Sequence, residues 1–254
     1  MRHVRPVDFS AYRGEGYEFQ ILYSGESCRV IGSHVAPKAT APPHHYHLVD
    51  QLYYVIDGEM QLQLGSERLT AGPDTLVFIP AGTPHHNWNE GDVPEFHFEV
   101  LAPGPHPNDP VMVPTEAIDA GGRGYFVKPL ARDGFDPATP GFALQKLLQR
   151  SDGSDNMTLY VGTVEPGGAG PDTHIHPFDQ FYFVLEGELS AEIAFEQVAA
   201  RRHNLVVLPA GVPHKQWNDA AVAERHITLI APEPMPGVPW DVGVELTPTG
   251  VTHT

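Results

Sequence analysis

The sequence has one cysteine, few basic residues and no long hydrophobic run. Cys28 alone cannot form an intramolecular disulfide, which favours a reducing compartment. Lysine and arginine number 15 against 32 acidic residues, and the net charge of -17 disfavours nucleic acid or an anionic membrane as partner. No apolar run reaches the roughly 20 residues that span a bilayer, and residues 1–16 lack the apolar core of a signal peptide. We therefore predict a cytoplasmic protein with no nucleic acid and no membrane partner.

Long helical patterns are also scarce, and residues 141–150 form the best helix-like stretch. Most of the chain consists of short apolar or alternating runs bounded by Gly, Pro and Asp turns, which predict β-strands. In the first half these runs are residues 29–35, 52–56, 60–64, 76–79 and 96–101, and in the second half residues 157–164, 181–185, 189–195, 205–208 and 227–230. Short, evenly spaced strands predict an all-β chain with a small sandwich or barrel in each half.

One constant offset relates the two halves of the chain. A shift of 129 residues superimposes His45 on His174, and it needs no gap from about residue 30 to residue 103. The other matched positions include Gln51 and Gln180, Gly58 and Gly187, His85 and His214, Trp88 and Trp217, Asn89 and Asn218, and His97 and His226. Chance does not sustain one register through so many Gly, His and Trp positions, so the protein is a duplication of one module.

The boundary between the modules lies in a proline-rich connector. Residues 104–110 carry three prolines and no apolar periodicity, which is typical of a linker. We place the N-terminal domain at residues 1–112 and the C-terminal domain at residues 113–254. A short echo lies outside the main register, because Val4-Arg5-Pro6 returns as Val127-Lys128-Pro129 at an offset of 123.

Histidines in each module have the spacing of metal ligands. His45 and His47 are two residues apart, so on a strand both imidazoles point to the same face. His85, which follows a Pro-Ala-Gly turn, can add a third nitrogen from a distant strand. His174, His176 and His214 repeat the pattern. Three nitrogens on one face suit a divalent transition metal.

Both modules resemble cupins, which are small jelly-roll β-barrels. The first cupin motif is matched by His45, His47, position 51 and Gly58, and the second by Pro80, Gly82, His85 and Asn89, with both motifs repeated in the second half. The chain is therefore similar to bicupins, and the resemblance implies two tandem cupin domains. Gln51 and Gln180 stand where most cupins carry Glu, and a set of three histidines with glutamine is similar to that of the bacilysin-pathway isomerase bicupin.

The resemblance implies one divalent transition metal in each domain. The metal ligands would be His45, His47, Gln51 and His85 in the first domain and His174, His176, Gln180 and His214 in the second. Fe(II) is favoured, while Mn, Co, Ni, Cu and Zn also suit nitrogen and oxygen ligands. Neutral ligands leave the metal its full charge, so we expect an anionic or chelating small-molecule substrate.

Other repeated residues have two interpretations each. Tyr53 and Tyr182 share the strand parity of the glutamines, so they are either catalytic proton donors or packed rim residues. Asn89 and Asn218 bind substrate or cap a turn, and His97 and His226 are a catalytic acid–base pair with the neighbouring Glu95 and Glu224 or structural salt bridges. Trp88 and Trp217 have the other parity and are expected in the core.

These features predict a metal-dependent bicupin enzyme acting on a small oxygenated organic acid or phenolic compound. A dioxygenase-type reaction is the first expectation, because cupin dioxygenases are widespread among metal bicupins, although this rests on fold analogy. An isomerase or tautomerase of an enolisable 2-oxo acid is the alternative, and a non-enzymatic small-molecule-binding cupin is the second. The chain is expected to be a monomer or a homodimer.

Overall fold

The computed structural model describes residues 3–40, 42–118, 124–247 and 250–253. Over these residues the chain is almost entirely β-structure, and the helical elements are two short 3-10 turns, η1 (Phe9–Ala11) and η2 (Arg150–Asp152). No helix in the described ranges is long and apolar enough to cross a membrane. The predicted all-β class is confirmed.

The chain forms two compact units that do not follow chain order completely. The N-terminal unit contains residues 7–130 and 151–156, and the C-terminal unit contains residues 1–6, 131–150 and 157–254. The sequence repeat places the division between residues 112 and 113, and the compact units cross it at three short segments. Two of these segments supply edge strands, as described below.

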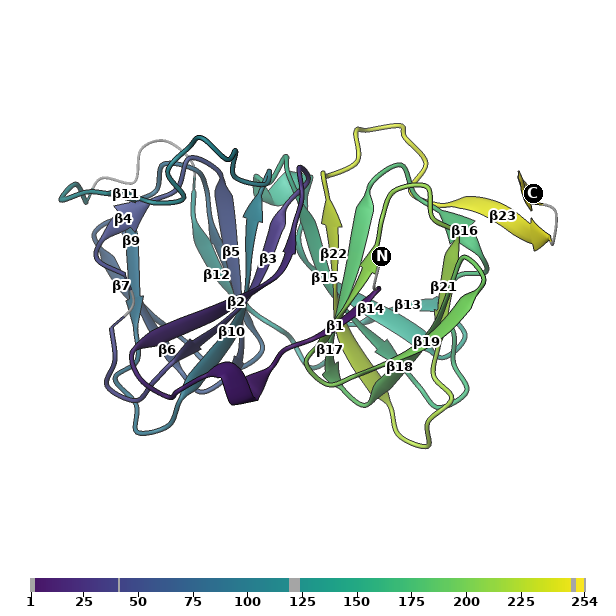
Figure 1. Ribbon diagram of the computed structural model, residues 1–254, viewed down its shortest axis with the longest axis horizontal. Helices are drawn as coiled ribbons and strands as arrows, with labels where there is room; N and C mark the ends of the chain where they lie inside the picture. Colours follow the sequence, from purple (N-terminus) through teal and green to yellow (C-terminus); the bar gives the residue numbers. More distant parts are fainter. Residues whose placement is uncertain (1–2, 41, 119–123, 248–249, 254) are drawn as a thin grey trace. The chain divides into compact units, whose positions relative to one another are not determined.

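The N-terminal unit has two antiparallel sheets (Figure 1). The six-stranded sheet has the order β12 (Phe126–Pro129), β8 (Thr75–Ile79), β5 (Asp50–Asp57), β10 (Glu95–Ala102), β3 (Arg29–Val35) and β2 (Tyr17–Ser24). The five-stranded sheet has the order β11 (Val113–Pro114), β4 (His45–Tyr46), β9 (His85–Trp88), β6 (Met60–Leu64) and β7 (Glu67–Ala71).

The C-terminal unit repeats this topology with added edge strands (Figure 1). Its larger sheet has the order β1 (Val4–Pro6), β20 (Asn204–Leu208), β17 (Asp179–Glu186), β22 (Glu224–Ala231), β15 (Thr158–Val164), β14 (Phe142–Leu148) and β13 (Asp136–Thr139). The other has the order β19 (Glu196–Arg201), β18 (Glu188–Ile193), β21 (His214–Trp217), β16 (His174–Ile175), β23 (Val242–Thr247) and β24 (Gly250–His253).

The Val-Arg/Lys-Pro echo marks two strands that the modules exchange. Val4 pairs with Val206 in the C-terminal unit, and Val127 pairs with Val77 in the N-terminal unit. Val77 and Val206 are equivalent at the offset of 129, so each segment occupies the same place in the sheet of the other module. Each ends at proline, which lacks a donor and is tolerated on an edge strand.

The cores of the two units are built from the same positions. Eight buried residues pack together in each unit, and the offset of 129 relates them one to one. In the N-terminal unit they are Tyr53, Val55, Met60, Leu62, Leu64, Ala71, Val77 and Ile79. In the C-terminal unit they are Tyr182, Val184, Leu189, Ala191, Ile193, Ala200, Val206 and Leu208. Because successive side chains of a strand point to opposite faces, these residues bury one face of every contributing strand. The same alternation sets which side chains reach the cavity inside each unit.

Two expectations from the sequence are wrong. Residues 141–150 do not form a helix: Phe142–Leu148 is strand β14, which pairs with β15 along its length, and Arg150 belongs to the short 3-10 turn η2. The sheet pairing of β14 overrides the local helical pattern. Trp88 and Trp217 are not core residues: they are half-buried on the outer face of β9 and β21, opposite the inward histidines.

Candidate metal centres

The three histidines of each unit meet as their spacing predicts. His45 on β4 is the direct cross-strand partner of His85 on β9, and their ring centroids are 4.4 Å apart. His47 lies on the same side, 4.9 Å from the His45 ring. In the C-terminal unit His174 pairs with His214 in the same way, at 4.5 Å, and His176 lies 4.7 Å from His174. All six are buried, and one nitrogen from each histidine of a triad lies within 4.8 Å of the others.

Backbone carbonyls determine which ring nitrogen is left free in each of these six histidines. Each Nδ1 faces a carbonyl oxygen, at 2.5 to 2.9 Å, and because a carbonyl can only accept, Nδ1 must carry the proton. The acceptors are Pro43, Val111 and Thr83 for His45, His47 and His85, and Asp172, Trp240 and Val212 for His174, His176 and His214. All six Nε2 atoms are left as bare lone pairs, the form that binds a metal.

Burial favours the neutral form of five of these rings. It lowers the pKa of His45 to about 4 and the pKa of His214 to about 3. Burial also lowers the pKa of His47, His85 and His176 below the ordinary value. At neutral pH these imidazoles are therefore available as ligands without first losing a proton.

Gln51 presents its amide oxygen to the N-terminal triad. Its Nε2 donates to Glu99 Oε1 at 2.8 Å, so the amide is held with Oε1 turned away from the carboxylate. That oxygen is buried and has no hydrogen-bond partner among the residues that the structure describes, and the same is true of Nε2 of His47 and of His85. Three buried acceptors without a donor are costly unless a cation lies among them.

Gln180 occupies the equivalent place in the C-terminal triad. Its Oε1 lies 2.9 Å from Nε2 of His176 and 2.9 Å from Nε2 of His214. Since the Nδ1 atoms of both rings hold the protons, three acceptors crowd together with no proton between them. A divalent cation relieves this repulsion, so the residues of both units fit a metal with nitrogen and oxygen ligands.

Both triads open onto a cavity. The N-terminal cavity has a volume of about 250 Å³ and is lined by His45, His47 and Gln51 and by a mostly apolar wall. Its other lining residues are Tyr17, Phe19, Ile21, Arg29, Ile31, Pro42, Tyr53, Asn87, Glu99, Leu101, Val111 and Met112. The C-terminal cavity, about 310 Å³, is more polar and includes Lys146, Tyr160, Gln216 and Asp241.

The two tyrosines predicted as proton donors face these cavities. Tyr53 and Tyr182 are almost completely buried, and each lines the cavity of its own unit. Burial, followed by the Glu99 charge, raises the pKa of Tyr53 well above its ordinary range, and burial likewise raises the pKa of Tyr182. Each hydroxyl therefore keeps its proton at neutral pH, and Tyr182 donates to Gln216 Oε1 at 2.5 Å.

The asparagines predicted as substrate ligands hold turns instead. Asn89 Nδ2 donates to the carbonyls of Val35 and Val93, at 3.1 and 2.8 Å, and its Oδ1 accepts from Gly91 N. Asn218 makes the equivalent three bonds in the second unit. Neither side chain lines a histidine cavity. These contacts match the turn-capping interpretation, and we do not include either asparagine in the proposed site.

The histidines predicted as acid–base residues lie behind the tyrosines. His97 Nδ1 lies 2.9 Å from the Glu95 carboxylate, and its ring packs edge-on against Tyr53 at 4.9 Å. Burial opposes protonation of His97, but the Glu95 carboxylate outweighs it and raises the pKa of the ring. His226 pairs with Glu224 in the same way at 2.8 Å. Both histidines are fully buried and line neither cavity, so the salt-bridge interpretation describes them.

Some site residues were missed by sequence reasoning. Glu99 is a buried carboxylate of β10 that also accepts from Ser33 Oγ at 3.0 Å and Tyr17 OH at 3.1 Å. Its counterpart in the second module is Thr228, so the sequence repeat does not mark Glu99. The carbonyls of Val111 and Trp240 are equivalent at the offset of 129, but a backbone acceptor leaves no mark in the side-chain pattern. Strand parity with His85 is the signal that could have found Asn87.

The Cupin domain family matches residues 33–100 and 160–224, just over half of the chain. No curated protein sequence matches significantly.

Among solved structures, the putative glyoxylate-induced protein of Pseudomonas aeruginosa is similar, with a TM-score of 0.69 and 18% identity over 88% of this chain and 84% of that one. AerE from Microcystis aeruginosa has a TM-score of 0.67 and 18% identity over 91% and 97%. Bacillus subtilis oxalate decarboxylase has a TM-score of 0.68 and 13% identity over 91% and 78%. These structures share the fold, and with two cupin matches and two histidine triads the chain belongs to the cupin family as a bicupin.

Proposed function

We propose that this bicupin is a metal-dependent enzyme that acts on a small oxygenated organic acid or phenolic compound. The observation that carries the proposal is the convergence of bare histidine nitrogens and a glutamine oxygen at the wall of a cavity in each unit. Bacillus subtilis oxalate decarboxylase, which shares the fold, has Mn(II) centres. In this chain a divalent transition metal, with Fe(II) favoured, is the proposed cofactor of each domain.

The proposed ligands are the same four positions in each unit. They are His45, His47, His85 and Oε1 of Gln51, and His174, His176, His214 and Oε1 of Gln180. Bound there, the metal would supply Lewis acidity and stabilise negative charge on a substrate oxygen. All four ligands are neutral, which favours an anionic or chelating substrate as partner.

Residues of the chain prepare the N-terminal site for that substrate. Glu99 holds the Gln51 amide, and the Tyr17 and Ser33 hydroxyls in turn hold Glu99. Because these hydrogen bonds fix the Gln51 amide, its oxygen does not need to reorganise during the reaction. The Tyr53 hydroxyl, which retains its proton, is the proposed donor of a hydrogen bond or a proton to a substrate oxygen.

A dioxygenase-type reaction is the first form of the proposal. Apolar side chains of Ile31, Leu101 and Met112 form much of the N-terminal wall, which suits an apolar or aromatic substrate and limits the access of water. An isomerase or tautomerase is the second form, and Glu99 favours it, because a buried carboxylate at the cavity wall is suited to moving a proton on an enolisable acid.

Metal analysis and oxygen uptake test the proposal in sequence. Elemental analysis of the purified chain is expected to find about two equivalents of a transition metal. The loaded protein is then screened with 2-oxo acids and catechols while dissolved oxygen and product are both followed. Oxygen consumed in proportion to product supports the dioxygenase, and full conversion without oxygen uptake supports the isomerase. A chain that takes up no Fe(II), Mn(II), Ni(II) or Zn(II) on anaerobic reconstitution would contradict both forms.

A further inference from the structure

Arg29 contributes a cation to the wall of the N-terminal metal cavity. It begins strand β3 and has the same parity as Ile31 and Ser33, whose side chains face inward toward the Glu99 region. The side chain is half-buried and lines the same cavity as His45 and His47. A charged group is therefore built into a wall that is otherwise largely apolar.

The Arg29 guanidinium has unused hydrogen-bonding capacity. Its contact within the described part of the chain is a long hydrogen bond of 3.4 Å from Nε to Ser24 Oγ, and no carboxylate there lies within ion-pair distance. A guanidinium offers five donors in a planar fork that matches a carboxylate. In a chain with 32 acidic residues and 15 basic ones, a cavity arginine left without an acidic partner is suited to an external anion.

The mouth of this cavity exposes large apolar side chains. Phe19 is 57% exposed, Ile21 52% and Met112 42%, and all three line the cavity. Apolar surface left uncovered around a cavity gains free energy when an apolar ligand covers it. The lining thus combines an apolar surface, a free guanidinium and the metal ligands.

The C-terminal cavity lacks this combination. Thr158 stands at the position equivalent to Arg29, and it is buried. Lys146 occupies the sheet position of the C-terminal unit that corresponds to Ile21. Ile21 pairs with Ile31, and Lys146 pairs with Tyr160, the residue equivalent to Ile31. Lys146 lies over the Trp240 ring at 5.7 Å, so its charge is already engaged. The free guanidinium is a property of the N-terminal unit.

We propose that Arg29 is a specificity-determining residue that binds a carboxylate on the substrate of the N-terminal site, while the apolar body of that substrate covers Phe19, Ile21 and Met112. This inference rests on the proposed function, since the opposite end of the substrate is the one directed to the metal. The substrate class is an aromatic acid whose carboxylate lies apart from its metal-chelating oxygens.

A matched pair of probes tests the charge alone. 3,4-Dihydroxybenzoate and 3,4-dihydroxybenzamide carry the same chelating oxygens and nearly the same shape, and only the first is an anion at its far end. Their affinities are measured by isothermal titration calorimetry on metal-loaded protein carrying His174→Ala and His176→Ala, which leaves the N-terminal centre. We expect the benzoate to bind about 10- to 100-fold more tightly, the range for a hydrogen-bonded charged pair.

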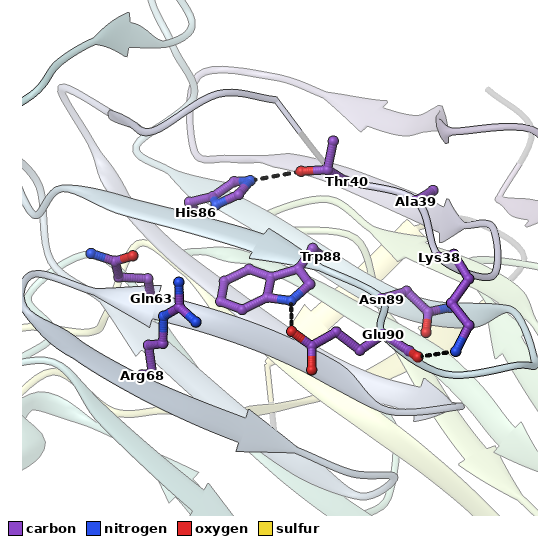
Figure 2. A pocket seen from close by; sticks show the side chains of 9 residues that line it. All are labelled: Lys38, Ala39, Thr40, Gln63, Arg68, His86, Trp88, Asn89 and Glu90. Atoms are coloured by element: carbon purple, nitrogen blue, oxygen red, sulfur yellow. Dashed lines mark hydrogen bonds between the residues drawn. The ribbon is translucent and has the colours of Figure 1, made fainter.

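Arg29→Gln is expected to reduce the ratio of the benzoate affinity to the benzamide affinity to about one. The benzamide affinity itself should stay within a factor of two of that of the parent protein. Arg29→Lys should retain part of the preference, because the charge remains but the planar fork is lost. Arg68→Gln is the matched control. Arg68 lies over the Trp88 ring in a separate pocket that shares no residue with the metal cavity (Figure 2), so this variant should keep the full preference.

The outcomes separate this inference from the proposed function. An unchanged benzoate preference in Arg29→Gln, with full metal content and an unchanged melting temperature, would overturn the role of Arg29 and leave the metal enzyme standing. Equal binding of both probes to the parent protein would overturn it as well. Absence of metal in the parent protein would instead count against the proposed function, and the inference would fall with it.

Discussion

The two metal centres have the same ligands but different surroundings. In both units one histidine on a short strand, a second just after that strand, a third on the neighbouring strand and a glutamine converge, and the same backbone positions hold the imidazoles. The cavity walls differ at equivalent positions, which are Arg29 and Thr158, Ile31 and Tyr160, Glu99 and Thr228, and Met112 and Asp241. Duplication has thus kept the ligand geometry and varied the part that a substrate would contact.

This difference follows from what each part requires. Ligand atoms must meet within a few ångströms, and for the histidines that depends on strand register and backbone carbonyls, which a wall substitution leaves intact. Wall residues have no such shared constraint. We therefore expect both centres to bind metal, and the N-terminal centre, with its carboxylate and arginine, to carry the activity of the proposed enzyme.

Removal of histidine ligands has the largest expected effect. His45→Ala with His47→Ala should lower the metal content from about two equivalents to about one, and His174→Ala with His176→Ala should do the same, since a single histidine and a glutamine do not retain a metal. Only the first pair should abolish turnover. Elemental analysis and turnover of both proteins test this, and equal loss of activity in the two variants would remove the distinction between the centres.

Glu99→Gln is expected to reduce turnover by about 100-fold, because it removes a carboxylate that orients Gln51 and can move a proton. Metal content should stay near two equivalents. Thr228→Val, at the equivalent position of the second unit, is the control and should retain nearly all activity. A steady-state kinetic comparison decides the matter: activity lost in Thr228→Val but kept in Glu99→Gln would assign catalysis to the C-terminal unit.

Asn89→Ala and Asn218→Ala test the equivalence of the units in stability. Each removes an amide that satisfies three backbone groups, so each should lower the free energy of unfolding by about 2 kcal/mol. The affinity for 3,4-dihydroxybenzoate should not change, because neither side chain lines a metal cavity. Urea unfolding measures the free energy of unfolding, and calorimetry measures the affinity. A fall in the affinity for 3,4-dihydroxybenzoate without a fall in the free energy of unfolding would contradict this prediction.

Acidification of the metal-free protein tests the buried imidazoles that the two units share. Burial lowers the pKa of His45 to about 4 and of His214 to about 3, so the unfolded chain takes up protons first as the pH falls below about 6.5. Stability should therefore decrease from pH 6.5 to about 4 for His45 and on toward 3 for His214, by at most about 1.4 kcal/mol per pH unit for each. Urea unfolding between pH 7 and pH 4 measures the slope, and a flat profile would contradict it.

Much of the architecture and of the metal set could be predicted from local pattern. Side-chain alternation predicted that His45 and His47 would point to the same side, and the single offset of 129 predicted that His85 and His214 would complete equivalent triads. Strand ranges such as Arg29–Val35 and Met60–Leu64 agree with the predicted bounds because their turns are marked by Gly, Pro or Asp. Alternation and turn chemistry act over a few residues and can therefore be read directly.

The amino-acid sequence by itself thus determined the duplication, the all-β class and the six inward histidines, since these follow from spacing alone. Only the tertiary structure decided that β1 and β12 exchange places, that residues 142–148 pair as a strand, and that Glu99 and Arg29 reach the N-terminal cavity. It also decided which carbonyls hold His47 and His176, 64 residues away along the chain. Such contacts depend on which distant backbone groups become neighbours, and no local periodicity encodes that choice.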